Sequence, residues 1–294
     1  MKLGVLTVVL SQMELEKAMK YLADSGVQMV EIGCGGFPGK AHCDPEVLLN
    51  DDSKLEAFKN AIYGNGLEIS ALSCHGNPVH PNKEKAKKFH DDFINTVLLA
   101  EKLGVDRIVG FSGCPGDCPE SKYPNWVTCP WPEDFLEILD YQWNEVLIPY
   151  WKETAEFAKQ HGIKKICFEM HPGFCVYNPE TLLRMREAVG DIIGANFDPS
   201  HLIWQGMDPV EAIRTLGDAV YFVHGKDVRL DKANIAKNGV LDTKHYGDVI
   251  NRAWVFRTMG YGNDLKMWKD IVSMLKLVGY DDVISIEHED SLMS

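Results

Sequence analysis

The chain has 294 residues, 45% of them hydrophobic, and its 43 acidic residues outnumber 30 basic ones to give a formal net charge of −13. Nucleic-acid binding draws on basic side chains that neutralise phosphates, so this charge argues against a nucleic-acid partner. No apolar run approaches the roughly 20 residues that a membrane span requires, which argues against a membrane protein.

The N-terminus and the cysteines predict a cytoplasmic protein. The apolar stretch "MKLGVLTVVL" at the start is not followed by a small-residue cleavage site, so we predict no signal peptide. Eight cysteines in a long chain without a leader are typical of reduced thiols. A metal-bound loop at Cys114, Cys118 and Cys129 is the alternative, but "CPGDC" has the wrong spacing for a zinc knuckle or a CxxC redox pair.

Short runs rich in valine and isoleucine alternate with helical patterns along the chain. The predicted strands span residues 2–9, 27–36, 67–76, 105–113, 163–172, 192–201, 219–227 and 282–290. The main helical patterns span residues 12–26, 53–66, 84–104, 150–162, 179–190, 208–218 and 265–279. Strands that alternate with helices in this way predict an α/β protein with one (β/α)₈ TIM barrel over residues 1–294. A doubly wound open sheet is the alternative, but "VVLSQ" lacks the glycines of a phosphate loop.

The end of the chain predicts an incomplete ring of helices. Only "SLMS" follows the eighth predicted strand, so we expect the eighth helix to be absent. Either the chain is shortened or a neighbouring chain covers the gap. A homo-oligomer or a small second subunit would supply that cover.

Candidate metal ligands stand at the ends of four successive predicted strands. In chain order they are Glu169, Asp198, His224 and Glu287. The C-terminal ends of barrel strands carry the active site, and converging buried carboxylates require a cation. Three oxygen ligands and one nitrogen ligand suit one divalent ion with open positions, with Mn²⁺ expected and Mg²⁺, Co²⁺ or Zn²⁺ as alternatives. His171 shares a strand face with Glu169, because alternate residues of a strand point to one side.

The motifs "FEMHPG", "NFDPSH", "HGKD" and "ISIEHED" resemble those of the sugar phosphate isomerase/epimerase family, the xylose-isomerase-like TIM barrels. The resemblance covers essentially the whole chain. It implies one metal held by the four residues above, with Glu169 and Glu287 also acting as acid and base. It further implies that His201 contacts substrate oxygens. Lys226 matches a His-x-Lys-Asp form of the family, whereas Arg229 matches an epimerase arginine only loosely.

Two further segments, "LDTKHYGD" and "WVFRTMGYG", resemble a bacterial subgroup of the same family. Some relatives in that subgroup are catalytic subunits of C-glycoside deglycosidases, which cleave 3-keto glycosides by elimination. They pair with a small second subunit, which would explain an open barrel edge. In that branch a histidine two residues after the first ligand acts as base, and His171 stands in that place.

A metal beside a base predicts proton abstraction next to a carbonyl group. The substrate is then a small sugar, processed by an isomerase or epimerase, or a keto-glycoside, cleaved by a lyase. We expect Arg257, His75 and Lys226 to contact this substrate. The other candidates for sugar recognition are Glu31, Asn77, Ser112, Trp126 and Trp131. An AP endonuclease and a non-catalytic sugar-binding barrel are the rival functions.

Overall fold

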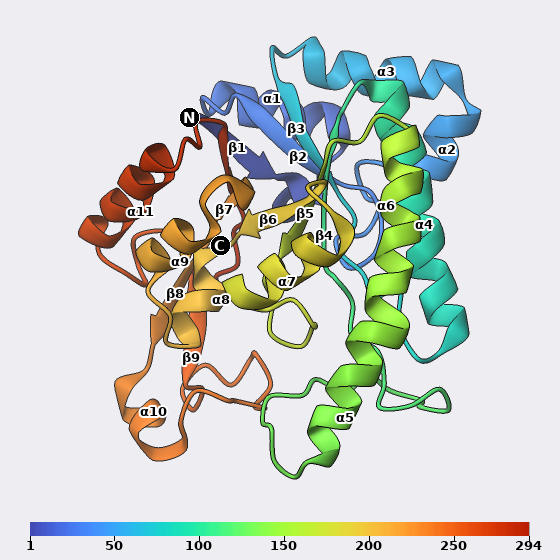
Figure 1. Ribbon diagram of the computed structural model, residues 1–294. Coiled ribbons are helices and arrows are strands. Elements are labelled where there is room, and N and C mark those ends of the chain that lie inside the picture. Colours follow the sequence, from blue (N-terminus) through green and yellow to red (C-terminus); the bar gives the residue numbers. More distant parts are fainter. Residues whose placement is uncertain (294) are drawn as a thin grey trace.

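The computed structural model describes residues 1–293 and contains a closed barrel of eight parallel strands (Figure 1). The order around the barrel is β1-β10-β7-β6-β5-β4-β3-β2. The strands are β1 (Lys2–Leu6), β2 (Met29–Gly33), β3 (Glu68–Ser73), β4 (Arg107–Gly110), β5 (Lys165–Glu169), β6 (Ile193–Phe197), β7 (Val220–Gly225) and β10 (Val283–Ile286). The predicted TIM barrel is therefore confirmed, and the open-sheet alternative is excluded.

Helices surround the barrel, as expected for crossovers between parallel strands (Figure 1). The α-helices are α1 (Leu15–Asp24), α2 (Pro45–Asn50), α3 (Asp52–Tyr63), α4 (Lys83–Leu103), α5 (Asp134–Asp140), α6 (Ile148–Gln160), α7 (Pro179–Val189), α8 (Pro199–Trp204), α9 (Pro209–Leu216), α10 (Lys232–Asn238) and α11 (Leu265–Leu277). Within residues 1–293, no helix follows β10, as predicted. No helix in this part of the chain is both long enough and apolar enough to cross a membrane.

Several strands are shorter than the sequence predicts, and local chemistry explains two of them. The first strand ends at Leu6 because residues 7–10 form a 3₁₀ turn. The sixth ends at Phe197, since Pro199 occupies the first turn of α8 and the Asp198 side chain caps that helix through the Ser200 N–H. His201 consequently lies on α8 rather than on a strand.

The long segment after β7 forms a separate antiparallel hairpin, which the strand pattern did not predict. Strands β8 (Asp227–Leu230) and β9 (Trp254–Arg257) pair outside the barrel, and α10 lies in the loop between them (Figure 1). Trp254 stacks on Trp204 of α8 with ring centroids 4.5 Å apart. This contact fixes the hairpin beside the end of β6.

The barrel interior has an apolar base with a polar layer above it. Its buried cluster consists of Met29, Ala71, Val109, Cys167, Phe222 and Val283, each from a different strand. Two residues further along their strands come Glu169 and His224, which must point to the same interior because side chains alternate. The packed base thus holds the polar side chains at the C-terminal end of the barrel.

Candidate active site

The structure brings the four predicted metal ligands together at the C-terminal end of the barrel. Glu169, Asp198, His224 and Glu287 each offer a ligand atom, and these atoms all lie within 4.8 Å of one another. The first three residues are buried, and the Glu287 side chain is 16% exposed toward the cavity above. Three acids and an imidazole concentrated in this way require positive charge for compensation.

The orientation of His224 is set by a residue on the opposite side of its ring. Its Nε2 lies 2.9 Å from Oε2 of the buried Glu31, whose carboxylate also accepts hydrogen bonds from Ser73 and Ser285. Its Nδ1 faces the cluster, 2.8 Å from Glu287 Oε2. A carboxylate behind a metal-ligating histidine is the usual arrangement for fixing the ring and its tautomer. Glu31 therefore supports His224, and the idea that it recognises sugar is wrong.

Two carboxylate oxygens in the cluster lack hydrogen-bond partners within residues 1–293. Asp198 uses Oδ1 to cap α8, 2.8 Å from the Ser200 N–H, but its buried Oδ2 has no such partner. Burial raises the pKa of Asp198, because the charged form loses water without full compensation. Glu287 Oε2 is likewise without a hydrogen-bond partner. These oxygens and His224 Nδ1 form the donor set of a divalent cation, so the residues fit the metal that the sequence predicts.

Glu169 is the most heavily contacted of the four. Its Oε2 lies 3.0 Å from His75 Nε2, and its Oε1 lies 3.0 Å from His201 Nε2. Burial alone would raise the pKa of Glu169, but His201, His224 and His75 together hold it well below the usual range. Glu169 is therefore an anion. His201 lies between Glu169 and Asp198 and is not among the residues that line the cavity, and its role toward substrate stays a prediction.

His75 lies on the cavity wall rather than in a purely structural loop. Its ring meets the edge of Phe111 at a centroid distance of 4.6 Å. The backbone of the neighbouring loop approaches closely, since Phe37 N donates to the His75 carbonyl at 2.7 Å. Gly36 makes this approach sterically feasible, because a Cβ there would lie 1.8 Å from that same oxygen.

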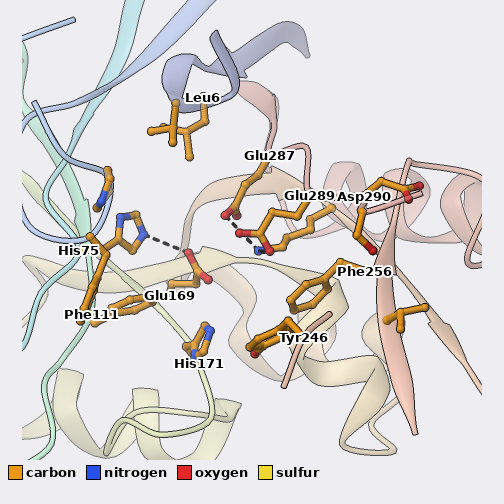
Figure 2. Close-up of a pocket in the computed structure, with 16 residues that line it drawn as sticks. Leu6, His75, Phe111, Glu169, His171, Tyr246, Phe256, Glu287, Glu289 and Asp290 are labelled. Carbon is orange, nitrogen blue, oxygen red and sulfur yellow. Dashed lines mark hydrogen bonds and ion pairs between the residues drawn. The ribbon is translucent and has the colours of Figure 1, made fainter. Parts of the chain in front are cut away.

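His171 has the protonation state that a base requires. Its Nδ1 lies 2.6 Å from the carbonyl oxygen of Pro172, which can only accept, so the proton lies on Nδ1 and Nε2 is free to accept. Burial, together with the proximity of His201 and Lys226, lowers the pKa of His171 to about 3. The neutral imidazole lines the cavity beside Glu169 (Figure 2).

A cavity of about 490 Å³ opens above these side chains. Figure 2 shows Glu169 and Glu287 in its polar part, with Phe111 and His75 on one side and Tyr246 and Phe256 on the other. Tyr246 comes from the loop between β8 and β9, so the hairpin supplies one wall. The cavity therefore presents a polar surface over the four candidate metal ligands and aromatic surfaces around it.

The last two residues of the "HGKD" motif, Lys226 and Asp227, have different roles. The Lys226 ammonium reaches Glu287 Oε1 at 3.0 Å and Glu289 Oε2 at 3.1 Å. Although burial disfavours its charge, Glu287, Glu289 and Asp198 raise the pKa of Lys226 well above its usual range. Asp227 points away and accepts hydrogen bonds from the backbone of residues 260, 262 and 263. Lys226 thus faces the cavity, whereas Asp227 anchors a loop.

Other residues predicted to contact substrate lie elsewhere. Arg257 is not among the cavity-lining residues; its Nε donates to Asp290 at 3.0 Å. Trp126 lines a second cavity, of about 300 Å³, and Trp131 is 74% exposed. Asn77 exchanges two hydrogen bonds with the Cys114 backbone.

Ser112 has a structural role that the sequence does not reveal, Glu289 lines the cavity without having been predicted to, and the cysteines are free thiols. The Ser112 hydroxyl accepts from Val176 N. Glu289 was not predicted as a site residue, although the period-two pattern from Glu287 would have placed it on the same side. All eight cysteines are free, and within residues 1–293 none joins a candidate metal cluster.

The comparisons with known proteins agree with this architecture. The chain is 41% identical to the uncharacterized protein YfiH of Bacillus subtilis (strain 168) over 296 residues, covering 100% of this chain and 94% of that protein. A D-psicose 3-epimerase from Clostridium cellulolyticum H10, solved with D-tagatose, has a TM-score of 0.64 at 16% identity and covers 98% and 84% of the two chains.

A second solved structure shares the fold and contains a metal. It is the IOLI protein with a bound zinc atom, with a TM-score of 0.64 at 19% identity, covering 98% of this chain and 88% of that one. The family model described as the xylose isomerase-like TIM barrel matches residues 19–292. The chain therefore belongs to the xylose isomerase-like TIM barrel family.

Proposed function

We propose that the protein is a divalent-metal-dependent sugar isomerase or epimerase that removes a proton from the carbon next to a carbonyl group. The observation that carries this proposal is the convergence of Glu169, Asp198, His224 and Glu287 at the base of the cavity. The fold shared with a sugar 3-epimerase supports it. We expect one ion per chain, with Mn²⁺ preferred, although the zinc in the IOLI structure keeps Zn²⁺ open.

The bound ion would polarise a substrate carbonyl and make the neighbouring C–H bond more acidic. Glu169, kept anionic by its histidine contacts, takes the proton from the substrate carbon. Glu287 lies across the cluster and would pass a proton taken up from solvent to the other face, which gives an epimer. Return to the neighbouring carbon gives an isomer. Lys226 offers an ammonium to substrate oxygens, and the aromatic walls restrict water.

Solvent proton exchange tests the proposal directly. Deuterium incorporation from D₂O into a panel of ketoses, followed by NMR, should appear with Mn²⁺ and disappear with EDTA. Glu169→Gln and Glu287→Gln should each slow exchange by about 10²–10⁴-fold at saturating Mn²⁺, since each removes a general base or acid. Glu187→Gln, on the exposed face of α7, is the matched control and should exchange normally. Near-normal exchange in either site variant removes that residue from the proposed chemistry.

The geometry of His171 supports a second candidate, a 3-keto-glycoside lyase. His171 is not one of the four proposed metal ligands, so its accepting Nε2 can act as a separate base, although His171, Glu169 and His201 form a second group that could hold a metal. In an elimination, this base takes the proton next to the keto group, the electron pair forms a carbon–carbon double bond, and the bond to the leaving group breaks. The same cluster would hold the keto sugar. A simple epimerase that works through two glutamates does not need this imidazole.

One variant separates the two functions. His171→Ala should keep metal affinity, abolish cleavage of a 3-keto glycoside and spare ketose exchange. Equal loss of both activities would make His171 a support for the metal cluster and would remove the argument for the lyase. Nicking of abasic DNA by the wild-type protein would instead favour the AP endonuclease that the acidic charge argues against.

A further inference from the structure

Lys226 is buried between two carboxylates, only one of which belongs to a predicted metal ligand. One belongs to Glu287, a predicted metal ligand, at 3.0 Å; the other belongs to Glu289, which no ligand set includes, at 3.1 Å. Asp198 Oδ2 is further away, at 3.9 Å. The ammonium is therefore shared almost equally between a ligand and a non-ligand.

The surroundings of Lys226 leave its ammonium little freedom. Its side chain is 4% exposed, and the ring of Phe256 lies beneath the charge, 4.4 Å from Nζ to the centroid. A buried ammonium must keep its ionic partners, because water cannot replace them. The Glu289 side chain is 52% exposed at the cavity wall and is not a predicted metal ligand, so its carboxylate is available to hold the ammonium.

The two oxygens of Glu287 face different groups. Oε1 meets Lys226, whereas Oε2 points to His224 Nδ1 and has no hydrogen-bond partner within residues 1–293. A contact on Oε1 thus fixes the rotation of the carboxylate that presents Oε2 to the cluster. Ligating carboxylates in metal sites are commonly held by such outer hydrogen bonds.

We propose that Glu289 and Lys226 form a positioning pair for Glu287: Glu289 holds the ammonium, and the ammonium holds Glu287 as a one-oxygen ligand. The proposal rests on the proposed metal-dependent function and adds a residue to it. Glu289 touches no predicted ligand itself and acts through Lys226. Without Glu289, Lys226 is drawn fully to Glu287 and competes with the ion for that carboxylate.

The local charge is consistent with this arrangement. Glu31, Glu169, Asp198, Glu287 and Glu289 are five carboxylates gathered around the site. Against them stand the Lys226 ammonium and, when bound, one divalent ion, which together supply three positive charges beside the imidazoles of His75, His201 and His224. The site has enough negative charge to hold both cations at once. Glu289 directs the ammonium to the outer side of the cluster and leaves the inner side for the ion.

Mn²⁺ titration by calorimetry tests the pair on the full chain without substrate. Glu289→Gln should weaken Mn²⁺ binding by about 10–100-fold, the usual effect of removing an outer-layer partner. Glu187→Gln removes an equal charge from the exposed face of α7 and should bind like wild type. In a Lys226→Met background, Glu289→Gln should have no further effect, because its partner is gone.

The outcomes separate the pair from a general effect of charge. If Glu289→Gln weakens binding equally with and without Lys226, Glu289 acts only through its field and the positioning role is overturned. If Lys226→Met fails to fold, Glu289→Asp replaces the double-variant comparison. This variant keeps the negative charge but has a shorter side chain, so the proposal is overturned if it binds Mn²⁺ with wild-type affinity. If Glu289→Gln binds Mn²⁺ with wild-type affinity, only the proposed positioning pair is overturned. If the wild-type protein itself binds no Mn²⁺, the proposed function is overturned as well.

Discussion

Replacing Glu31 with Gln should weaken metal binding although Glu31 is not a predicted ligand. The side chain is fully buried behind His224, and its two oxygens lie 2.9 and 3.1 Å from His224 Nε2. Ser285 Oγ donates to it at 2.6 Å, and Ser73 donates as well. The carboxylate therefore keeps a proton on Nε2 and leaves Nδ1 to face the cluster as a ligand.

The size of the effect follows from these contacts. An amide in place of the carboxylate turns one acceptor into a donor, which faces a serine hydroxyl or the histidine N–H and loses at least one buried hydrogen bond. Outer-layer changes of this kind cost about 10–100-fold in metal affinity. That range corresponds to about 1.4–2.8 kcal/mol of binding free energy. The unmatched donor should also lower the free energy of unfolding by about 1–3 kcal/mol.

Calorimetric Mn²⁺ titration and urea unfolding of the metal-free protein measure the two effects separately. Glu68→Gln is the control, because Glu68 is an exposed glutamate at the start of the neighbouring strand β3. The reasoning about Glu31 is refuted if Glu31→Gln binds Mn²⁺ with wild-type affinity while His224→Ala does not bind it.

Three further outcomes are expected. Asp227→Asn should lower the free energy of unfolding by about 3 kcal/mol in urea denaturation. The substitution removes a charged acceptor from several backbone N–H donors, and hydrogen bonds to a charged acceptor contribute about 1.5–3 kcal/mol each. A loss below 1 kcal/mol would contradict the anchoring role. Only the exposed Cys118 and Cys129 should react with a thiol reagent in the native state at pH 8, since burial raises the pKa of Cys167 to about 12; fast labelling of Cys167 would count against its burial. Mn²⁺ at 100 times its Kd should stabilise the fold by about 2.7 kcal/mol, so EDTA should lower Tm; an unchanged Tm would mean that the folded state holds no metal.

Periodicity was enough to predict the barrel and to place the four candidate metal ligands at one end of it. Alternate residues of a strand point to the same side, so Glu169 shares the interior face with Cys167 and His224 shares it with Phe222. Parallel strands end at one face, which brings their last polar residues together without knowledge of any loop. The convergence of Glu169 with Glu287 could therefore be predicted from the positions of the strand ends alone.

The supporting contacts could not be predicted in this way. Glu31 lies 193 residues from His224, and only the closed strand order places the two side by side. The pairing of Arg257 with Asp290 depends on the path of the chain after β10, which no repeating pattern encodes. The hairpin that carries Tyr246 into the cavity wall is equally non-periodic. These contacts are set by tertiary packing between distant segments.

The most direct test of the account is a crystal structure of the wild-type protein grown with Mn²⁺, with anomalous scattering recorded on both sides of the manganese absorption edge. The account predicts one anomalous peak per chain at the base of the cavity, within coordinating distance of Glu169, Asp198, His224 and Glu287. A peak elsewhere, or none at these residues at Mn²⁺ concentrations that support exchange activity, would contradict the central claim.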